Sequence, residues 1–432
     1  MIQLIRGFKD ILPPESDLWH YIEKTAVTLF QDFGFKEIRI PVLEHTELFA
    51  RSIGEHTDIV EKEMYTFPDR KGEMITMRPE ATASVVRAYI QHKLYAGDPV
   101  KKLYTLGPMF RRERPQKGRY RQFYQINAEV FGIASPLIDA QIIFMLMTFF
   151  NRLRVSDLYL QLNSLGCPRC RPGYRALLSE YLTDKVQGLC EDCKIRSQKN
   201  PLRVLDCKVP GCIEAMQNAP TISDHLCHDC FRHFDAVKTQ LAKQDIPFVL
   251  NRRLVRGLDY YTRTTFEIQT GRLGAQSAVA GGGRYDGLVG ALGGPDQPAV
   301  GFAVGFDRLA ELLQHETEDH VRHPGCYIAA LDENSRELAY EWLCTLSEAG
   351  IQTDMDYDGR SLKSQMKRAD RLKAAYVLIL GENELLKGKA VLRNMSTKSQ
   401  EEIPLAEVVR VIEETLKGDS SAHPTNSMEN GV

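Results

Sequence analysis

The clearest hydrophobic pattern in the chain is a strand-like alternation in residues 107–132. Side chains in a strand point alternately to opposite faces. On the returning half of this segment, the apolar face holds Tyr124, Ile126, Ala128 and Val130, and the opposite face holds Phe123, Gln125, Asn127 and Glu129. So many amides and acceptors in a row exceed the needs of a structural strand. We therefore expect a β-hairpin whose polar face holds a ligand.

A basic tip joins the two expected strands. Between Arg111 and Arg121 the chain carries six Arg or Lys residues, and Glu113 is the only acid. A charged loop on a hairpin with a polar face indicates a phosphate-bearing partner. The alternative is a solvated turn with surface arginines.

The segments around the hairpin predict a domain of mixed helices and strands. We expect helices over 17–33 (with Ser16 as N-cap), 78–93, 136–152 and 307–314, strands over 35–40, 159–162, 253–261, 264–270 and 299–306, and a Gly-rich turn at 281–283. Residues 167–250 are instead helical, charged and rich in cysteine. The simplest account is a core domain formed by residues 1–166 and 251–318, interrupted by a helical insertion over 167–250.

A strand–helix–strand–helix–strand pattern follows a polar linker. The strands are expected over 326–331, 352–355 and 375–380, and the helices over 335–349 and 361–372. This alternation predicts a separate small α/β domain over residues 323–416 with a partly parallel sheet. Residues 417–432 are polar and poor in apolar side chains, which predicts a disordered tail.

Composition narrows the class of protein. A chain of 432 residues with 43% hydrophobic and 26% charged residues is typical of a globular protein with two or three domains. The net charge of −2 means that any nucleic-acid contact must come from local basic patches. No apolar run reaches the length of a signal peptide or a bilayer span, so we expect a cytosolic protein that does not contact the membrane.

Eight of the ten cysteines lie in the expected insertion. They form four close pairs, Cys167 with Cys170, Cys190 with Cys193, Cys207 with Cys212, and Cys227 with Cys230. In a cytosolic protein such crowding indicates metal or redox use rather than a disulfide framework. The spacing fits tetrahedral zinc sites that would tie down the insertion. A set of reduced structural thiols is the alternative, and the pairing of the pairs cannot be read from the sequence.

Three further charged residues are candidates on chemical grounds. Glu80 is expected in the first turn of a helix, where a carboxylate either serves the helix dipole or binds a substrate ammonium group. Arg256 lies in an apolar run, where it needs an anion or an internal ion pair, with Asp259 as the nearest acid. Arg308 is expected in the first turn of another helix, where the pattern alone favours a surface residue, and only the family resemblance implies a phosphate ligand.

These segments resemble the class II aminoacyl-tRNA synthetases, and the histidyl-tRNA synthetases in particular. Residues 110–113 (FRRE) resemble motif 2 of the class, residues 299–309 resemble motif 3, and residues 35–41 resemble motif 1, which builds the family's dimer interface. Residues 256–261 (RGLDYY) resemble a histidine-specific motif, and residues 278–286 resemble a second one. Ala81 stands where the family often has glycine, a difference of one methyl group.

The resemblance implies an α+β protein with an antiparallel-sheet catalytic core, a helical insertion and a C-terminal α/β anticodon-binding domain. It implies ligation of L-histidine to its tRNA through a histidyl-adenylate, with ATP and Mg²⁺, by a homodimer. Most members of the family lack the cysteine pairs, so the resemblance does not support zinc.

The resemblance also assigns residues to the site. Histidine would be bound by Glu80, Thr82, Gln125, Glu129, Arg256, Tyr260, Tyr261 and Tyr285, and ATP by Arg111, Glu113, Arg119 and Arg308. Arg111 and Arg256 would be catalytic, meeting the α-phosphate from two sides. The tRNA would contact Gln116 and Arg121 in the hairpin tip, and Arg360, Lys363 and Lys367, which we expect with Arg371 along one helical side.

Two alternative functions belong to different classes. The synthetase-like regulatory subunit of ATP phosphoribosyltransferase lacks the C-terminal domain and has degraded catalytic arginines, whereas this chain keeps Arg111, Arg256 and Arg308. A non-catalytic tRNA-sensing module would keep the basic faces but would not need an intact ATP and histidine pocket.

Overall fold

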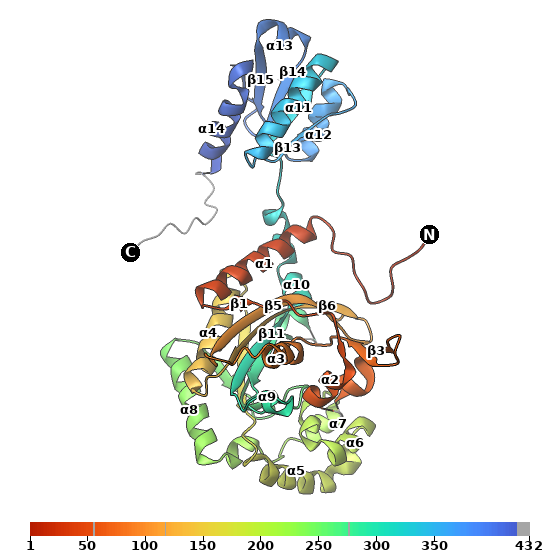
Figure 1. The fold of residues 1–432 in the computed structure, drawn as a ribbon, viewed down its shortest axis with the longest axis vertical. Coiled ribbons are helices and arrows are strands. Elements are labelled where there is room, and N and C mark those ends of the chain that lie inside the picture. Colours follow the sequence, from red (N-terminus) through yellow and green to blue (C-terminus); the bar gives the residue numbers. More distant parts are fainter. Residues whose placement is uncertain (55–56, 117, 275–276, 421–432) are drawn as a thin grey trace. The chain divides into compact units, whose positions relative to one another are not determined.

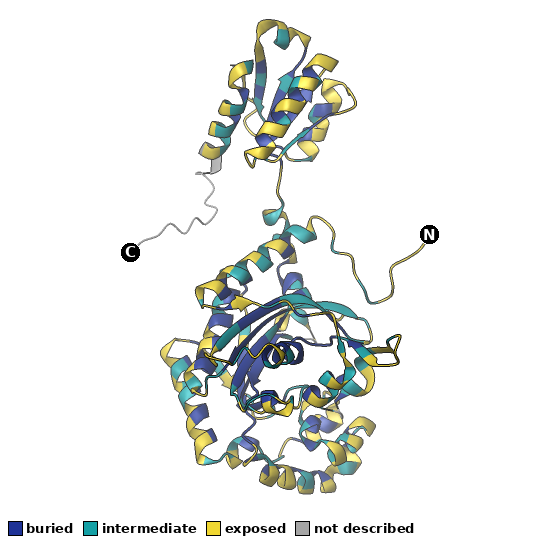
Figure 2. Ribbon diagram, in the orientation of Figure 1, coloured by how far each residue is buried: buried dark blue, intermediate teal, exposed yellow. Residues whose placement is uncertain are grey.

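The computed structural model describes residues 1–54, 57–116, 118–274 and 277–420. The chain divides into two compact units, one from Met1 to His320 and one that begins at Val321. Each unit has its own buried apolar core, which is dark blue in Figure 2. Among the described residues, no helix combines the length and hydropathy needed to cross a bilayer.

An eight-stranded sheet forms the centre of the first unit (Figure 1), in the order β1-β5-β6-β11-β10-β9-β7-β8. The strands are β1 (Lys36–Glu37), β5 (Lys101–Phe110), β6 (Gln122–Phe131), β7 (Leu158–Ser164), β8 (Phe248–Leu250), β9 (Thr262–Thr270), β10 (Ala278–Arg284) and β11 (Ala299–Gly305). All pairs from β5 to β7 along this order are antiparallel, whereas β1 and β8 pair in parallel at the two edges. The expected hairpin is β5–β6.

The two faces of this sheet are covered by different helices. Helices α1 (Glu15–Asp32) and α4 (Pro136–Arg152) share one core with Ile126, Ala128 and Val130 of β6. Helix α3 (Thr82–Gln91) packs near the other face, with residues such as Met109 and Phe131. The two faces of β6 are therefore as predicted: its apolar side chains face α1 and α4, and its polar side chains lie on the side of α3.

Smaller elements complete the first unit. They are the sheet β2-β4-β3 (Leu43–His45, Met74–Met77, Tyr65–Pro68), helices α2 (Thr46–Ile53), α9 (Leu288–Ala291) and α10 (Phe306–Leu312), the π-helix η1 (Ile59–Glu63) and the 3₁₀ helices η5 (Gly271–Leu273) and η6 (Gln314–His320).

Between β7 and β8 the chain forms a helical segment, as the sequence predicts. It contains α5 (Arg171–Lys185), η2 (Val186–Gly188), α6 (Glu191–Lys199), η3 (Pro201–Asp206), α7 (Pro210–Ala215), η4 (Ile222–His225) and α8 (His228–Lys243). The first part has a small core of its own. Helix α8 lies along α4, where His233 Nε2 is 2.8 Å from the buried carboxylate of Asp139, which also pairs with Arg284.

The second unit is a five-stranded sheet with helices. Its order is β13-β12-β14-β15-β16, with β12 (Cys326–Ala330), β13 (Thr353–Met355), β14 (Tyr376–Leu380), β15 (Lys389–Asn394) and β16 (Gln400–Pro404). The helical elements are α11 (Glu333–Glu348), α12 (Leu362–Arg371), α13 (Glu382–Lys387), η7 (Leu405–Glu407) and α14 (Val408–Ser420). β12 pairs in parallel with β13 and β14, and the other pairs are antiparallel, which confirms the partly parallel sheet.

Several local predictions are wrong. The first helix begins at Glu15 with Pro14 at the N-cap, so Ser16 lies inside it. Only Lys36–Glu37 of the strand predicted over 35–40 forms a ladder. The predicted tail begins too early, because α14 continues to Ser420; residues 421–432 lie outside the described part. The fourth concerns residues 253–261, which form an irregular loop instead of a strand.

The Gly-rich turn predicted at 281–283 is also wrong, because these residues lie in β10. Glycine is needed there for close approach rather than for turning. A Cβ on Gly282 would clash with the carbonyl oxygen of Gly301 on β11, and a Cβ on Gly281 would lie 2.5 Å from the guanidinium of Arg256.

Candidate active site

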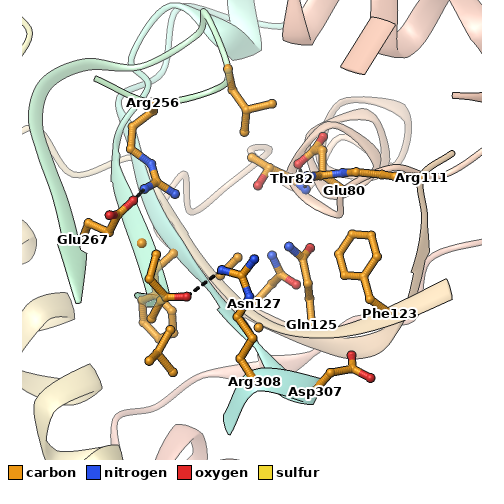
Figure 3. A pocket seen from close by; sticks show the side chains of 18 of the residues that line it. Glu80, Thr82, Arg111, Phe123, Gln125, Asn127, Arg256, Glu267, Asp307 and Arg308 are labelled. Carbon is orange, nitrogen blue, oxygen red and sulfur yellow. Dashed lines mark hydrogen bonds and ion pairs between the residues drawn. The ribbon is translucent and has the colours of Figure 1, made fainter. Parts of the chain in front are cut away.

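A cavity of about 360 Å³ lies against the polar face of β6 in the first unit (Figure 3). Its lining includes all twelve residues that the sequence assigns to histidine and ATP: Glu80, Thr82, Arg111, Glu113, Arg119, Gln125, Glu129, Arg256, Tyr260, Tyr261, Tyr285 and Arg308. They come from segments spread over more than half of the chain. The antiparallel sheet brings these segments together.

Glu129 is the centre of a buried hydrogen-bond group in the cavity. The hydroxyl of Thr82 donates to one oxygen of its carboxyl group at 2.7 Å, and the hydroxyl of Tyr285 donates to the other. The pKa of Glu129 is raised to about 8, mainly by burial and to a lesser extent by nearby Glu80, although the hydrogen bonds from the Tyr285 and Thr82 hydroxyls act in the opposite direction. This carboxyl group is poised to change its charge when a cation enters.

Glu80 also lies in the cavity, but it precedes α3 and is not in its first turn. Its carboxylate accepts from the backbone N–H groups of Thr82 at 2.7 Å and Ala83 at 2.8 Å. Burial raises the pKa of Glu80, and these two bonds lower it. Glu80 therefore serves the start of α3, as one of the two interpretations proposed, and its side chain also lines the cavity.

Aromatic rings and two unsatisfied amides form the rest of this end. Tyr260 stands 4.7 Å from Tyr261 and 5.6 Å from Tyr285 between ring centroids, and burial raises the pKa of each hydroxyl. On β6, the side-chain oxygens of Gln125 and Asn127 are buried and have no hydrogen-bond partner among the described residues. Buried acceptors without partners indicate a ligand that carries donors.

Three guanidinium groups reach the same cavity from different elements (Figure 3). Arg111 donates to the carbonyl of Pro79 at 2.9 Å and lies over the ring of Phe123 at 5.1 Å. Arg308 donates to the carbonyls of Ala278 and Gly118, at 2.7 and 3.2 Å. Burial, and then the positive charge of Arg119, lower the pKa of Arg308.

Arg256 is the third of these cations and lies in the loop after β8. It forms an ion pair with Glu267 of β9 and not with Asp259, whose carboxylate instead accepts from Asn200 at 3.0 Å. Burial lowers the pKa of Arg256, but Glu267 and other acids raise it by more. Its Nε is buried without a partner in the described structure.

The ion pair of Arg256 identifies a residue that the sequence analysis missed. Glu267 alternates with Phe266 and Ile268, which are buried in the core on the other face of β9. Period-2 alternation is therefore the signal that could have found it. Asn127 was placed on the polar face of its strand but was not assigned to the site. Glu113, by contrast, was assigned, and pairs with Arg119 at 3.0 Å.

The residues assigned to tRNA lie outside the cavity. In the hairpin tip Gln116 is exposed, while the Arg121 guanidinium donates to the carbonyls of Arg6 and Glu113, at 3.2 and 3.4 Å. In the second unit Lys363 and Lys367 are exposed on α12.

Arg360 does not share the helical side on which it was expected. It precedes α12 and pairs with Asp358 at 3.0 Å and Asp356 at 3.7 Å. Its aspartate partners, which lie in the preceding loop, fix its position. Only Lys363, Lys367 and Arg371 therefore follow one side of α12, at intervals of four residues.

The eight cysteines of the helical segment form two clusters of four. The outer cluster contains Cys167, Cys170, Cys227 and Cys230, and the inner cluster contains Cys190, Cys193, Cys207 and Cys212. Within each cluster the sulfurs lie within 4.8 Å of one another, and all eight are free thiols. In the sequence, the four cysteines of the inner cluster all lie between the two pairs of the outer cluster. The spacing alone did not show which pairs come together.

Comparison with known proteins gives a consistent result over most of the chain. The family model for histidyl-tRNA synthetase matches residues 7–309, and the anticodon binding domain matches residues 325–415. The Histidine–tRNA ligase of Desulfatibacillum aliphaticivorans is 62% identical over 405 residues, covering 94% of this chain and 97% of its own. That of Desulforapulum autotrophicum is 61% identical over 417 residues, covering 95% and 98%.

A solved structure agrees with this fold. Apo histidyl-tRNA synthetase from S. aureus superposes with a TM-score of 0.81 at 36% identity, covering 96% of this chain and all of that one. Together with the converging site residues, these matches assign the chain to a family. It belongs to the histidyl-tRNA synthetases.

Proposed function

We propose that this protein ligates L-histidine to its tRNA in an ATP-dependent reaction, as the names of its curated relatives describe for those proteins. The observation that carries the proposal is the convergence of Arg111, Arg256 and Arg308 on one cavity, beside a buried carboxyl-lined slot. Neither a tRNA sensor nor a regulatory subunit needs both the three arginines and the carboxyl-lined slot.

The buried end of the cavity fits histidine. Glu80 and Glu129 offer carboxyl oxygens for the ammonium group and for an imidazole N–H, and the free amide oxygens of Gln125 and Asn127 can accept further donors. Tyr260, Tyr261 and Tyr285 line the same cavity and offer aromatic walls for an imidazole ring. A buried polar slot of this kind rejects amino acids that lack matching donors by roughly 10⁴-fold or more.

The cationic end of the cavity fits ATP, and we infer an in-line adenylation. An oxygen of the histidine carboxylate attacks the α-phosphorus, the bond from that phosphorus to the bridging oxygen breaks, and pyrophosphate leaves. Arg111 and Arg256 stabilise charge on the α-phosphate from two sides, and Arg308 holds the departing phosphates. This is mainly positioning and charge neutralisation, which the fixed guanidinium groups supply.

ATP in this family is used with a divalent cation, and we propose Mg²⁺. The carboxylates of Glu113 and Glu267 line the cavity and offer the oxygen ligands that Mg²⁺ prefers. When bound, the ion neutralises charge on the phosphates of ATP.

The second step transfers the histidyl group to a ribose hydroxyl at the tRNA 3′ end and releases AMP. We propose that the second unit holds the anticodon region through Lys363, Lys367 and Arg371, since exposed lysines and arginines at helical spacing suit phosphate contacts. The exposed tip of the β5–β6 hairpin, including Gln116, is proposed to contact the acceptor end.

We also propose a homodimer. Three apolar side chains of the β2-β4-β3 sheet are exposed, with Leu43 at 44%, Phe67 at 42% and Met74 at 49%. Covering such a surface is favourable, and residues 35–41 beside it carry the motif 1 resemblance. Light scattering on the purified protein gives twice the chain mass if this is correct.

Each four-cysteine cluster is proposed to bind one structural Zn²⁺. A zinc ion about 2.3 Å from four tetrahedral sulfurs places those sulfurs about 3.8 Å apart. The observed separations are 3.7 Å for Cys167–Cys170, 3.9 Å for Cys167–Cys227 and 3.9 Å for Cys190–Cys207. The donor set and its geometry therefore fit the metal.

Histidine-dependent ATP–pyrophosphate exchange by the purified protein tests the proposed function. We expect exchange with L-histidine and Mg²⁺, and none with other amino acids. Transfer of labelled histidine to tRNA then tests the second step. Absence of exchange, together with intact tRNA binding, would leave only the non-catalytic alternative.

A further inference from the structure

The loop over residues 251–261 carries Arg256, Tyr260 and Tyr261, yet it has no helix or strand. It also lines a second cavity of about 360 Å³, together with Arg171, Arg175 and Arg203 of the helical segment. Cavities on both sides mean that close packing alone does not fix the loop. Its conformation must depend on specific contacts.

One of these contacts comes from the inner cysteine cluster. Arg203 lies in η3, between Cys193 and Cys207, and only 9% of it is exposed. Its guanidinium donates to the carbonyl oxygen of Arg256 at 3.0 Å and pairs with Asp58 at 3.3 Å. It therefore ties the active-site loop to the catalytic core by way of the insertion.

The inner cluster in turn fixes η3. The N–H of Cys207 donates to the carbonyl of Val204 at 3.2 Å, and Val204 packs in one small core with Cys193 and Cys212. A metal joining the four thiolates would therefore fix both flanks of η3. The adjacent Asn200 also donates to Asp259 of the loop at 3.0 Å.

A second contact comes from the outer cluster. Arg171 follows Cys170 directly, and its guanidinium donates to the carbonyl oxygens of Tyr261 and of Leu165, the latter at 3.2 Å. Directly after the loop, at the start of β9, the backbone N–H of Arg263 donates to the carbonyl of Gly166 at 2.8 Å. Each cluster thus controls one arginine that holds a carbonyl of the loop.

We propose that the two zinc sites position the active-site loop through Arg171 and Arg203, so that metal binding sets the place of Arg256 and Tyr261 in the catalytic cavity. Arg171 and Arg203 are positioning residues, because they contact the loop backbone and do not line the substrate cavity. The inference rests on the proposed zinc sites and deepens the proposed function.

Metal content is the first test. Elemental analysis of untagged protein should give two zinc ions per chain. The double variants C190S/C193S and C167S/C170S should each retain one. Fewer than two ions in the unaltered protein, or iron in place of zinc, would contradict the proposed zinc sites whatever the enzymatic activity.

Arg203→Ala tests the positioning step without touching a metal ligand. We expect unchanged zinc content, faster hydrogen exchange of the amides of residues 251–263, and roughly 10- to 100-fold lower kcat/KM for histidine in pyrophosphate exchange. Arg203→Lys should restore part of this loss. The matched control is Arg196→Ala. Arg196 also pairs with Asp58, at 2.7 Å, but within the described part of the chain its side chain makes no hydrogen bond or ion pair with the loop.

Arg196 also hydrogen-bonds Cys193 of the inner cluster, so the comparison is made on variants with unchanged zinc content. Equal effects of Arg203→Ala and Arg196→Ala on hydrogen exchange and kcat/KM would then overturn the positioning role, since the shared Asp58 pair would explain both. Absence of histidine-dependent exchange in the unaltered protein is a different failure. It contradicts the proposed function, while the hydrogen-exchange comparison still reports on the loop.

Discussion

Burial raises the pKa of Glu129 from 4.5 to about 8, so that its carboxyl group is protonated at neutral pH. A cationic substrate favours the ionised form, so binding is expected to release this proton. The Glu129 side chain can thus be buried in its neutral form and still ionise to bind a cation.

The raised pKa has a consequence for stability. Below about pH 4.5 the group is protonated in both the folded and the unfolded protein; between 4.5 and 8 only the folded protein keeps the proton. The contribution to the free energy of unfolding is therefore full at low pH and is lost as pH rises to about 8.

We expect the stability of the unaltered protein relative to Glu129→Gln to fall over this range, by at most about 1.4 kcal/mol per pH unit. Urea unfolding of both proteins without ligand from pH 5 to 9 measures the difference. A difference that stays flat or grows with pH would contradict the assignment.

Arg256 is the single residue whose removal should cost most. Arg256→Ala should lower the rate of histidine adenylation at least ~100-fold, because a fixed cation next to the α-phosphate is lost, while the melting temperature changes little. Pyrophosphate exchange and thermal unfolding measure the two quantities. Arg252→Ala, in the same loop but with its side chain 61% exposed, is the control and should be near neutral. A mild effect at Arg256 would show that another group stabilises the transition state.

Single residues differed in how far the sequence could place them. The polar side chains of β6 were predictable, because strand alternation depends only on backbone geometry. The sequence showed that Arg256 needs an anion. It could not show that the partner is Glu267, because the position of the loop relative to β9 depends on the tertiary structure. Arg203 gave no signal, because its role depends on a contact with a backbone carbonyl.

At the scale of elements, β10 and β11 lie so close to their neighbours that some of their positions have no room for a side chain. A Cβ on Gly301 of β11 would overlap a carboxyl oxygen of Glu129 and would lie 2.6 Å from the carbonyl oxygen of Ala128. The strand therefore leaves room for the carboxyl group only because a side chain is missing.

We expect Gly301→Ala to displace Glu129, reduce histidine binding at least ~100-fold and lower the melting temperature. Calorimetric titration with histidine and thermal unfolding measure these effects. Gly290→Ala in α9 is the matched control, since a Cβ added there would have no described neighbour within 4 Å, and this variant should bind histidine normally. Normal binding by Gly301→Ala would mean that Glu129 does not need its observed position.

Elements with a regular periodicity were predictable, and those shaped by neighbours were not. The helix over 136–152 was predicted with its observed bounds, because an uninterrupted apolar helix begins after Ser135, its N-cap. Residues 253–261 look like a strand because Leu254 and Val255 are apolar, but they are buried without a strand partner. Residues 281–283 look like a turn because local sequence does not reveal that Arg256 and Gly301 approach them.

At the scale of the whole molecule, the chemistry and the basic helix α12 belong to different compact units. We expect Lys363→Glu with Lys367→Glu to leave histidine-dependent pyrophosphate exchange unchanged and to raise the KM for tRNA several-fold. The dependence of log KM on log salt should fall by about 0.7–0.9 per lost phosphate contact. Aminoacylation at several salt concentrations measures both. Lys387→Glu, exposed on α13 of the same unit, carries the same charge change as Lys363→Glu alone and is the control for that single variant; an equal effect of the two would indicate general electrostatics rather than a contact on α12.

One internal pairing of the large sheet joins β6 to β11, which are separated in the chain by the whole helical segment and by β7 to β10. Synthesis on the ribosome runs from the N-terminus, so a nascent chain that ends between residues 132 and 298 presents β6 with one edge unpaired. Open strand edges recruit other strands, and pairings between distant segments form slowly. Pausing of translation within this window should therefore increase the dependence of the nascent protein on chaperones.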